Sequence, residues 1–312
     1  MINLAFLALS LFLVIKSSNY AIKYASNLAR VLRLPKYIIG FIVVAIISIL
    51  PETFIAINSA LGGIPSFGLG TLFGSNVADL TLVFAIIILS TAGGIRVGST
   101  ILESNKWYPF IIALPIFAGI DGYYSRAEGA FLVAAGLFFY YSTFRKNYPD
   151  CAVPEEKNHN HKHGLKNLGY LLLSMAVLLF GAQLTVKYGV SFAEFLKVNP
   201  VLIGMLVVGL GTTLPELLFS LRAVKHKDGC LAIGDILGTV ISDATIAVGI
   251  VALISPFAFP QRIIYITAMF MVLASILLFH FMRSGRILTK KEALLLFFFY
   301  AAFVSTEYLI NY

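Results

Sequence analysis

The chain has 312 residues, of which 59% are hydrophobic and only 12% are charged, and its formal net charge is +8. Soluble domains carry about 25% charged residues, so this composition excludes an ordinary soluble protein. Apolar runs of about 20 residues, the length that crosses a bilayer as a helix, recur along the whole sequence. The sequence therefore predicts an all-α polytopic membrane protein, and its excess of Lys and Arg indicates membrane topology rather than nucleic-acid binding.

Ten transmembrane helices are expected, in chain order at residues 2–24, 36–60, 68–92, 107–121, 127–144, 166–188, 200–222, 230–254, 262–282 and 292–311. The first run has neither a basic residue before it nor a small-residue cleavage site after it, which favours a helix over a signal peptide. One polar stretch, RKNYPDCAVPEEKNHNHKHGLK, separates the fifth helix from the sixth. We expect a first five-helix repeat at 1–145, a cytoplasmic linker at 146–165 and a second five-helix repeat at 166–312.

The distribution of basic residues sets the expected orientation, because cytoplasmic loops collect Lys and Arg. With the amino terminus outside, seventeen basic loop residues are cytoplasmic and only four face outward, namely Arg126, Lys187, Lys197 and Arg262. Both termini are then extracellular and the protein lies in the cell (plasma) membrane. Both cysteines, Cys151 and Cys230, fall on the cytoplasmic side, where thiols stay reduced, so no disulfide is expected between them.

The sequence repeats itself at a fixed offset. GFIVVAIISILPE begins at Gly40 and GMLVVGLGTTLPE at Gly204, an offset of 204 − 40 = 164 residues. GTLFGSNVADLT at Gly70 matches GDILGTVISDAT at Gly234 at the same offset. Because each half holds five helices, an odd number, the second half must enter from the opposite face. This predicts two inverted-topology repeats, an architecture typical of secondary transporters.

Four carboxylates are placed deep in the second, third, seventh and eighth helices: Glu52, Asp79, Glu216 and Asp243. Within each half they lie 27 residues apart, since 79 − 52 = 27 and 243 − 216 = 27. An ionised carboxylate at bilayer depth costs roughly 3 kcal/mol or more. A lone acid is compatible with a structural hydrogen bond, but four with duplicated spacing indicate a functional site.

A hydroxyl precedes each acid by four residues and shares its helix face, at Ser48, Ser75, Thr212 and Thr239. Pro51 and Pro215 each free a backbone carbonyl one turn earlier, and glycines loosen the third and eighth helices, so helices 2, 3, 7 and 8 are expected to be broken. Carboxylate, hydroxyl and carbonyl oxygens are the ligands that Ca²⁺ prefers. These segments contain no His, which argues against zinc or copper. No Walker loop occurs, and no cofactor is expected.

These motifs resemble those of the calcium/cation antiporter superfamily, most closely its prokaryotic sodium/calcium exchanger branch. That branch carries a GTSLPE-like and a GNxxGSN-like motif in each half, and here they stand as ISILPE with GTLFGSNVAD and as GTTLPE with GDILGTVISD. The resemblance implies that Glu52 and Glu216 are central calcium ligands and that Ser48 and Thr212 bind at the same site. It implies sodium-facing positions at Ser75, Thr239, Thr213, Ala45 and Gly209, and a polar pair at Asp79 and Asp243.

The chain departs from the resembling family at three positions. Ile49 stands where the family has a sodium-ligating serine, Ile47 replaces a glycine, and Asp79 stands where many exchangers have asparagine. One sodium position is therefore expected to be impaired and one carboxylate is gained. Crowded carboxylates repel one another and favour the binding of a proton. Sodium coupling is the expectation, and proton coupling is the alternative.

The expected function is secondary active antiport, with Ca²⁺ exported in exchange for Na⁺ through one central site of alternating access. The alternative is an H⁺-coupled exchanger of Ca²⁺ or another divalent cation. A cation channel with an acidic filter is disfavoured by the inverted repeat. An intramembrane enzyme is disfavoured because every acid is paired with a hydroxyl, which suits ion ligation. We expect no enzymatic activity and no nucleic-acid partner, and we expect a monomer in a lipid bilayer to suffice for transport.

Overall fold

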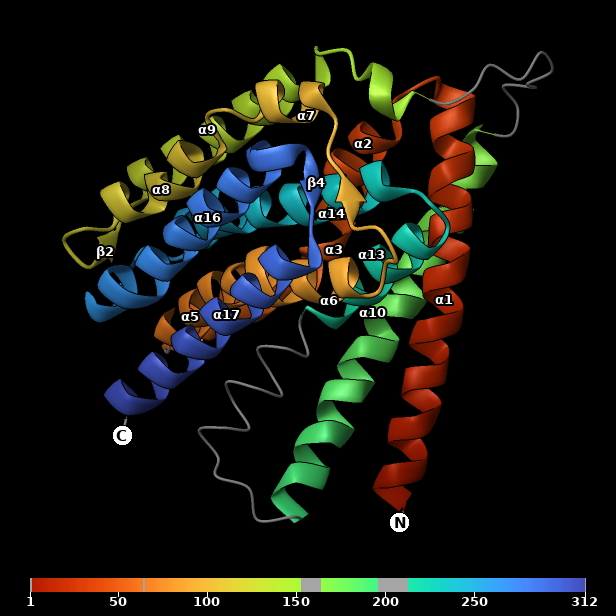
Figure 1. Cartoon of the computed structure of the whole chain (residues 1–312). Helices are drawn as coiled ribbons and strands as arrows, with labels where there is room; N and C mark the ends of the chain where they lie inside the picture. Colours follow the sequence, from red (N-terminus) through yellow and green to blue (C-terminus); the bar gives the residue numbers. More distant parts are fainter. Residues whose placement is uncertain (1, 64, 153–163, 196–212, 312) are drawn as a thin grey trace.

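A computed structural model of the chain describes residues 2–63, 65–152, 164–195 and 213–311 (Figure 1). The expected site residues Thr212 and Gly209 lie outside these ranges. The described part is built almost entirely from helices, with two short pairs of strands.

The elements of the first half, including two π-helical segments and one 3₁₀ turn, are α1 (Ile2–Leu32), α2 (Lys36–Ile38), η1 (Ile39–Val44), α3 (Ala45–Ser48), α4 (Leu50–Leu61), α5 (Pro65–Ala78), η2 (Asp79–Val83), α6 (Phe84–Leu89), β1 (Ile95–Arg96), α7 (Ser99–Ser104), α8 (Tyr108–Ala118), β2 (Tyr123–Tyr124), α9 (Arg126–Phe144) and η3 (Pro149–Cys151). Those of the second half are α10 (Gly164–Phe195), α13 (Leu214–Lys225), α14 (Gly229–Ile241), η6 (Ser242–Ala247), α15 (Val248–Ile254), β3 (Phe257–Ala258), η7 (Ile264–Ala268), α16 (Met269–Gly285), β4 (Ile287–Leu288) and α17 (Lys290–Asn311).

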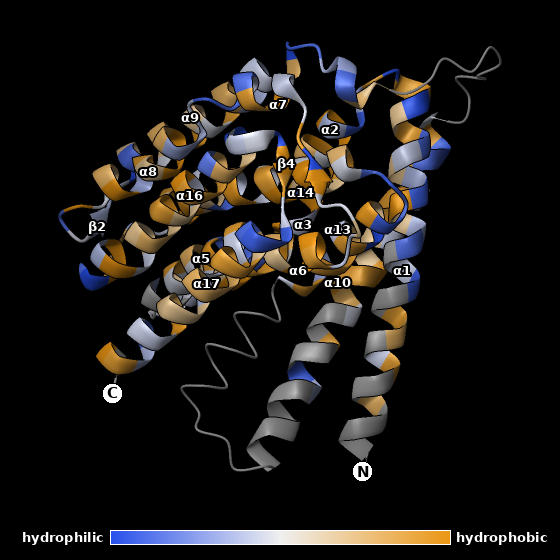
Figure 2. Ribbon diagram, viewed as in Figure 1, coloured by the Kyte–Doolittle hydropathy of each residue, from blue (hydrophilic) through white to orange (hydrophobic). Residues whose placement is uncertain are grey.

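Seven helical stretches of the described residues are long and apolar enough to cross a membrane: 36–61, 68–89, 126–144, 164–181, 229–254, 264–285 and 290–310. Large apolar side chains are exposed on the outer helices, such as Phe138 on α9 and Phe298 on α17, at 69% and 63%. Figure 2 shows that hydrophobic residues run along these helices. Apolar side chains gathered on an outer surface indicate a lipid environment. The chain is therefore a helical polytopic membrane protein.

The remaining three expected helices correspond to α1, α8 and α13. Helix α8 has only 11 residues, and the range expected for the seventh helix, 200–222, falls partly outside the described residues. Helix α1 extends to Leu32, eight residues beyond the expected end at residue 24. It continues because a stripe of small and apolar residues packs on α10 and α13, while Lys23 and Arg30 point outward; the stripe is Ala21, Ala25, Leu28 and Ala29.

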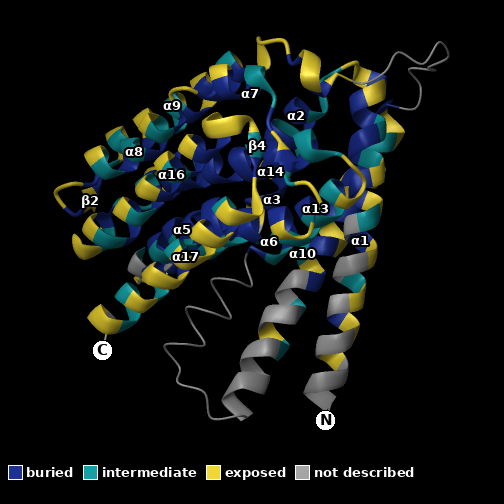
Figure 3. Ribbon diagram, viewed as in Figure 1, coloured by how far each residue is buried: buried dark blue, intermediate teal, exposed yellow. Residues whose placement is uncertain are grey.

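The centre of the molecule is the continuous run of α14, η6 and α15, most of whose residues are buried, including every residue of α14 from Leu231 to Ile241 (Figure 3). Close approach of α2 and η1 to α14 depends on glycine, because a Cβ placed on Gly234 would overlap the Tyr37 carbonyl oxygen of α2 and one on Gly238 would overlap the Phe41 carbonyl oxygen of η1. On the other side, the Tyr108 hydroxyl of α8 donates to the Leu237 carbonyl at 2.8 Å and the Tyr140 hydroxyl of α9 donates to the Gly238 carbonyl at 3.1 Å. These hydrogen bonds fix α14 between its neighbours.

Both halves widen their helix into a π turn where the expected acid stands. Segment η2 begins at Asp79, and η6 contains Asp243. In each, a threonine two residues after the acid donates its hydroxyl to the carbonyl four residues back: Thr81 to Val77 and Thr245 to Ile241. Side-chain bonds of this kind compete with the backbone ladder and deform it. The third and eighth helices widen here without an intervening turn residue, whereas Ile49 separates α3 from α4.

Two short antiparallel strand pairs join the halves. Strand β1 pairs with β4, with Ile95 opposite Leu288, and β2 pairs with β3, with Tyr123 opposite Ala258. Each pair connects one loop of the first half to one loop of the second. The halves are thus held together by loop pairing as well as by helix packing.

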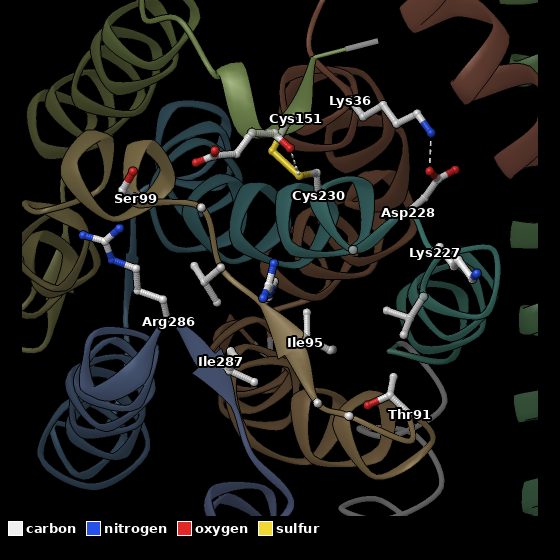
Figure 4. A pocket seen from close by; sticks show the side chains of 18 of the residues that line it. Lys36, Thr91, Ile95, Ser99, Cys151, Lys227, Asp228, Cys230, Arg286 and Ile287 are labelled. Carbon is white, nitrogen blue, oxygen red and sulfur yellow. Dashed lines mark hydrogen bonds and ion pairs between the residues drawn. A yellow bond between two sulfur atoms is a disulfide. The ribbon is translucent and has the colours of Figure 1, made fainter. Parts of the chain in front are cut away.

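A disulfide joins Cys151 to Cys230, so the expectation of unpaired cysteines is wrong (Figure 4). The Cα atoms lie 5.7 Å apart although the residues are 79 positions apart in the chain, and that separation suits a disulfide. The turn η3 brings Cys151 against the start of α14, where Cys230 is the second residue. The expectation considered only the compartment, and the tertiary contact that creates the pair is invisible in the sequence.

Candidate ion-binding site

The two glutamates occupy matching places at helix starts. Glu52 lies in the first turn of α4 and Glu216 in the first turn of α13, and each follows a proline by one residue. The preceding turn residues, Ile49 and Thr213, have similar backbone angles, with φ of −70° and −85° and ψ of −11° and −2°. Unpaired N–H groups at a helix start favour negative charge. Both carboxyl groups are buried, at 2% and 1% exposure.

The two aspartates complete a four-acid cluster, which we define as Glu52, Asp79, Glu216 and Asp243. Asp79 and Asp243 are also fully buried. The Glu52 carboxyl interacts electrostatically with the other three, and Asp79 interacts with both Glu216 and Asp243. The fold therefore gathers at its centre four carboxyl groups that lie far apart in the sequence.

The four-acid cluster is poorly compensated by the described protein atoms. No other described residue donates a hydrogen bond to either carboxyl oxygen of Asp79 or Glu216. The ion pair found among the described residues is Lys36 with Asp228. Asp79, Glu216 and Asp243 therefore have no Lys or Arg partner among these residues. Buried carboxylates are stable only when paired with donors or cations. The arrangement is therefore suited to receiving a cation.

Hydroxyl oxygens lie beside the acids. Ser48 ends α3 one turn before Glu52, and Thr239 lies one turn before Asp243 on α14; both are buried, and neither hydroxyl has a partner among the described residues. Ser75 is also buried but donates its hydroxyl to the Leu72 carbonyl at 3.1 Å. Its oxygen can still accept or ligate with its lone pairs.

The other expected ligands are only partly placed. Thr213 and Ala45 are buried, and Ala45 packs against Gly238 of α14. Thr212 and Gly209 fall outside the described residues. Among the described residues, no three His, Cys, Asp or Glu side chains are arranged to hold one metal ion between them. Carboxylates alone therefore form no such cage among these residues.

Asn76 was not singled out from the sequence. It is fully buried, and its amide nitrogen donates to the Val240 carbonyl and to the Met271 sulfur, both at 3.4 Å, while its amide oxygen has no described partner. The separation 240 − 76 = 164 equals the repeat offset, so Asn76 touches its own counterpart. In a two-fold arrangement, only residues on the axis do so. The GSN triplet that ends at Asn76 was the feature of the sequence that could have indicated this residue.

A family model described as sodium/calcium exchanger protein matches this chain twice, at residues 2–145 and 166–309. The sodium/calcium exchanger MaX1 of Methanosarcina acetivorans is 24% identical, with 97% of each chain covered. The inner membrane protein YrbG of Escherichia coli is 27% identical over 81% of this chain and 80% of its own length. A solved structure of the sodium-calcium exchanger NCX_Mj, soaked with Na⁺ and without Ca²⁺, is 22% identical and superimposes with a TM-score of 0.84, covering 97% and 98% of the two chains. The last comparison shows a shared fold.

Proposed function

Because the chain belongs to the sodium/calcium exchanger protein family, we propose that it is a secondary active antiporter that exports Ca²⁺ in exchange for Na⁺. The observation that carries the proposal is the four-acid cluster, which is buried in the membrane region and lacks compensating cations at Asp79, Glu216 and Asp243. Buried acids of this kind mark ion pathways in membrane proteins. Its relatives are named as exchangers, antiporters or membrane proteins, and not as enzymes.

The proposed architecture is ten membrane helices in two inverted five-helix repeats, at 1–145 and 166–312, with a linker at 146–165. Support comes from the two separate family matches, from the contact between Asn76 and Val240, and from the matched π turns of η2 and η6. We place the protein in the plasma membrane with both termini outside, as the basic loops indicate. A monomer holds all four acids and is proposed to suffice.

The proposed exchange follows from charge. Glu52 and Glu216 hold Ca²⁺ at the centre, and Ser48 and Thr212 add oxygen ligands. Ser75, Thr239, Thr213, Ala45 and Gly209 provide flanking oxygens for Na⁺. Four acids exceed the charge of one Ca²⁺ by two, so Na⁺ ions and Ca²⁺ compete for the same oxygens. Occupancy by one kind of ion then excludes the other, which is the requirement for countertransport through one site.

Proton coupling is the second candidate. It is favoured by the interaction of the Asp243 carboxyl with that of Glu52. Two carboxyl groups at close range do not both ionise readily, so one of them can carry a proton when Ca²⁺ is absent. The additional acid at Asp79, compared with the asparagine of many exchangers, increases this tendency.

The test is Ca²⁺ uptake into proteoliposomes under an imposed Na⁺ gradient or an imposed H⁺ gradient, each applied alone. The proposal predicts saturable uptake with the Na⁺ gradient. Uptake with only the H⁺ gradient would select the second candidate. Ca²⁺ flux that requires neither counter-ion would indicate a channel and contradict both.

A further inference from the structure

A fifth buried acid lies outside the four-acid cluster. Asp235 stands in the middle of α14 and is 0% exposed. One carboxyl oxygen accepts a hydrogen bond from the Ser220 hydroxyl of α13 at 3.1 Å, and the other, Oδ1, has no partner among the described residues. Ser220 is also fully buried.

The charge of Asp235 is not balanced by the described protein. The described ion pair, between Lys36 and Asp228, lies at the start of α14 and does not include Asp235. One neutral hydroxyl donor does not offset the burial of a carboxylate. A purely structural role would call for further donors around Oδ1, whereas a cation satisfies both the charge and the unpaired oxygen.

Asp235 continues a line of oxygens along α14 and into the start of η6. Asp235, Thr239 and Asp243 follow one another at four-residue spacing, so they share one helix face at steps of about 6 Å. On α13, Glu216 and Ser220 have the same spacing, and the Ser220–Asp235 hydrogen bond joins the two lines. Asp235 also interacts electrostatically with Asp79 and Glu216 of the four-acid cluster. The line therefore leads from the cluster toward the start of α14.

The start of α14 borders an open cavity of about 1190 Å³ (Figure 4). Its wall there contains the Lys36–Asp228 ion pair and the Cys151–Cys230 disulfide. Asp235 follows Asp228 by seven residues, about 10 Å along the helix. It thus lies at a depth between the cavity and the four-acid cluster.

The first half has no equivalent acid. At the repeat offset the counterparts are Ala56 for Ser220, since 220 − 164 = 56, and Thr71 for Asp235, since 235 − 164 = 71. Helices α4 and α5 are in direct contact at Ala56, because a Cβ on Gly68 of α5 would lie only 2.6 Å from the Cα of Ala56 in α4. The Ser220–Asp235 pair is therefore specific to one half. Because the repeats are proposed to be inverted, the pair then lies on only one side of the central site.

We propose that Asp235 and Ser220 form a second cation position, which holds Ca²⁺ or Na⁺ on its way between the four-acid cluster and the cavity. The ligands are Oδ1 and Oδ2 of Asp235 and the Ser220 hydroxyl oxygen. This inference rests on the proposed transport function and adds a directional feature to it. Cations that enter from the cavity side pass Asp235 before they reach the four-acid cluster, and cations that enter from the other side do not.

The test is Asp235→Asn in proteoliposomes of known orientation, with initial rates measured against the Ca²⁺ concentration at each face separately. Asparagine keeps the shape and can accept the Ser220 hydrogen bond, so the helices remain packed. Loss of the charged ligand raises the half-saturating Ca²⁺ concentration at the cavity face about tenfold and leaves the other face unchanged. A parallel series with Na⁺ as the varied ion shows which cation uses the position.

Two further variants make the test specific. Ser220→Ala removes a neutral ligand and produces a smaller shift, about threefold, at the same face. Thr71→Val is the matched control at the counterpart of Asp235, and it leaves half-saturation at the cavity face unchanged.

The outcomes separate this inference from the proposed function. Wild-type vesicles without countertransport would contradict the proposed function itself. Normal exchange by the wild type with superimposable curves for Asp235→Asn would overturn the second cation position. Equal shifts at both faces would also overturn it, because they would place the effect of Asp235 on the central site.

Discussion

The two halves of the molecule hold their acids in the same local structures but surround them with different neighbours. Each half has a glutamate in the first turn of a helix that follows a turn residue and a proline, and an aspartate in a π turn with a back-bonded threonine. The turn residue is Ile49 in the first half and Thr213 in the second. The acid–hydroxyl pair of Asp235 and Ser220 occurs only in the second.

This comparison separates two kinds of feature. The features that both halves share place carboxyl groups at the centre, and we expect them to be essential for transport in both halves. The features found in one half only are expected to determine which counter-ion is used and how the half-saturating ion concentration differs between the two membrane faces. Substitutions at both kinds of position test this division.

The largest effect is expected for the shared glutamates. Glu52→Gln and Glu216→Gln should each lower Ca²⁺ transport by about two orders of magnitude, because each removes a buried charged ligand. Glutamine keeps the size of the side chain, so insertion and monodispersity should match those of the wild type on size-exclusion chromatography. Near-normal flux in either variant would show that this glutamate is not a ligand and that the two halves are not equivalent.

The aspartates should differ from one another. Asp79 and Asp243 both interact with Glu52, but only Asp79 stands where many exchangers have asparagine. Asp243→Asn is therefore expected to lower transport about tenfold. Asp79→Asn restores the residue that many exchangers carry and should keep most of the activity. If Asp79 releases a proton during the cycle, its substitution should also flatten the dependence of Ca²⁺ uptake on pH between about pH 6 and 8. Equal losses for both variants would argue that the halves are equivalent at this position.

A smaller change is expected at the turn residues. Ile49→Ser adds a hydroxyl where the second half has Thr213, and Ile49 is buried at 4% exposure. Sodium dependence should strengthen by a few-fold, about the contribution of one neutral ligand. Thr213→Val is the reverse change and should weaken it. Saturation curves for Na⁺ that coincide with the wild type in both variants would contradict the missing-ligand explanation.

The smallest effect on transport is expected at the disulfide. Cys151→Ser should lower the thermal midpoint by about 5 °C, since removal of a disulfide loses its restraint on the unfolded chain. The Ca²⁺ half-saturation should change less than twofold, because Cys151 lies in the loop wall of the cavity and not among the acids. Non-reducing peptide mapping checks the pairing, and separate peptides that contain Cys151 and Cys230 would contradict it.

Much of this architecture was predictable because its signals are local or periodic. Membrane-length apolar runs predicted the helices, and motif resemblance predicted the family, which the double family match confirms. The 27-residue spacing and the repeat offset identified four acids that the fold does bury and gather. Their role as ligands remains a prediction.

What was missed depends on contacts between distant segments. The Cys151–Cys230 pair, the extension of α1 to Leu32 and the Asn76–Val240 contact each result from packing that no local pattern encodes. The π turns at Asp79 and Asp243 were expected as broken helices. In each of these turns a threonine, Thr81 or Thr245, donates its hydroxyl to the carbonyl four residues back.

The central claim is that one site, shared by both halves, binds Ca²⁺ and Na⁺ in competition. Its most direct measurement is anomalous diffraction from crystals soaked with Sr²⁺ as a calcium substitute, repeated after Sr²⁺ is replaced by Na⁺. A single site for which the two ions compete gives a peak among Glu52, Asp79, Glu216 and Asp243 that disappears in Na⁺. The absence of a peak among these acids, or a peak that persists at saturating Na⁺, would contradict it.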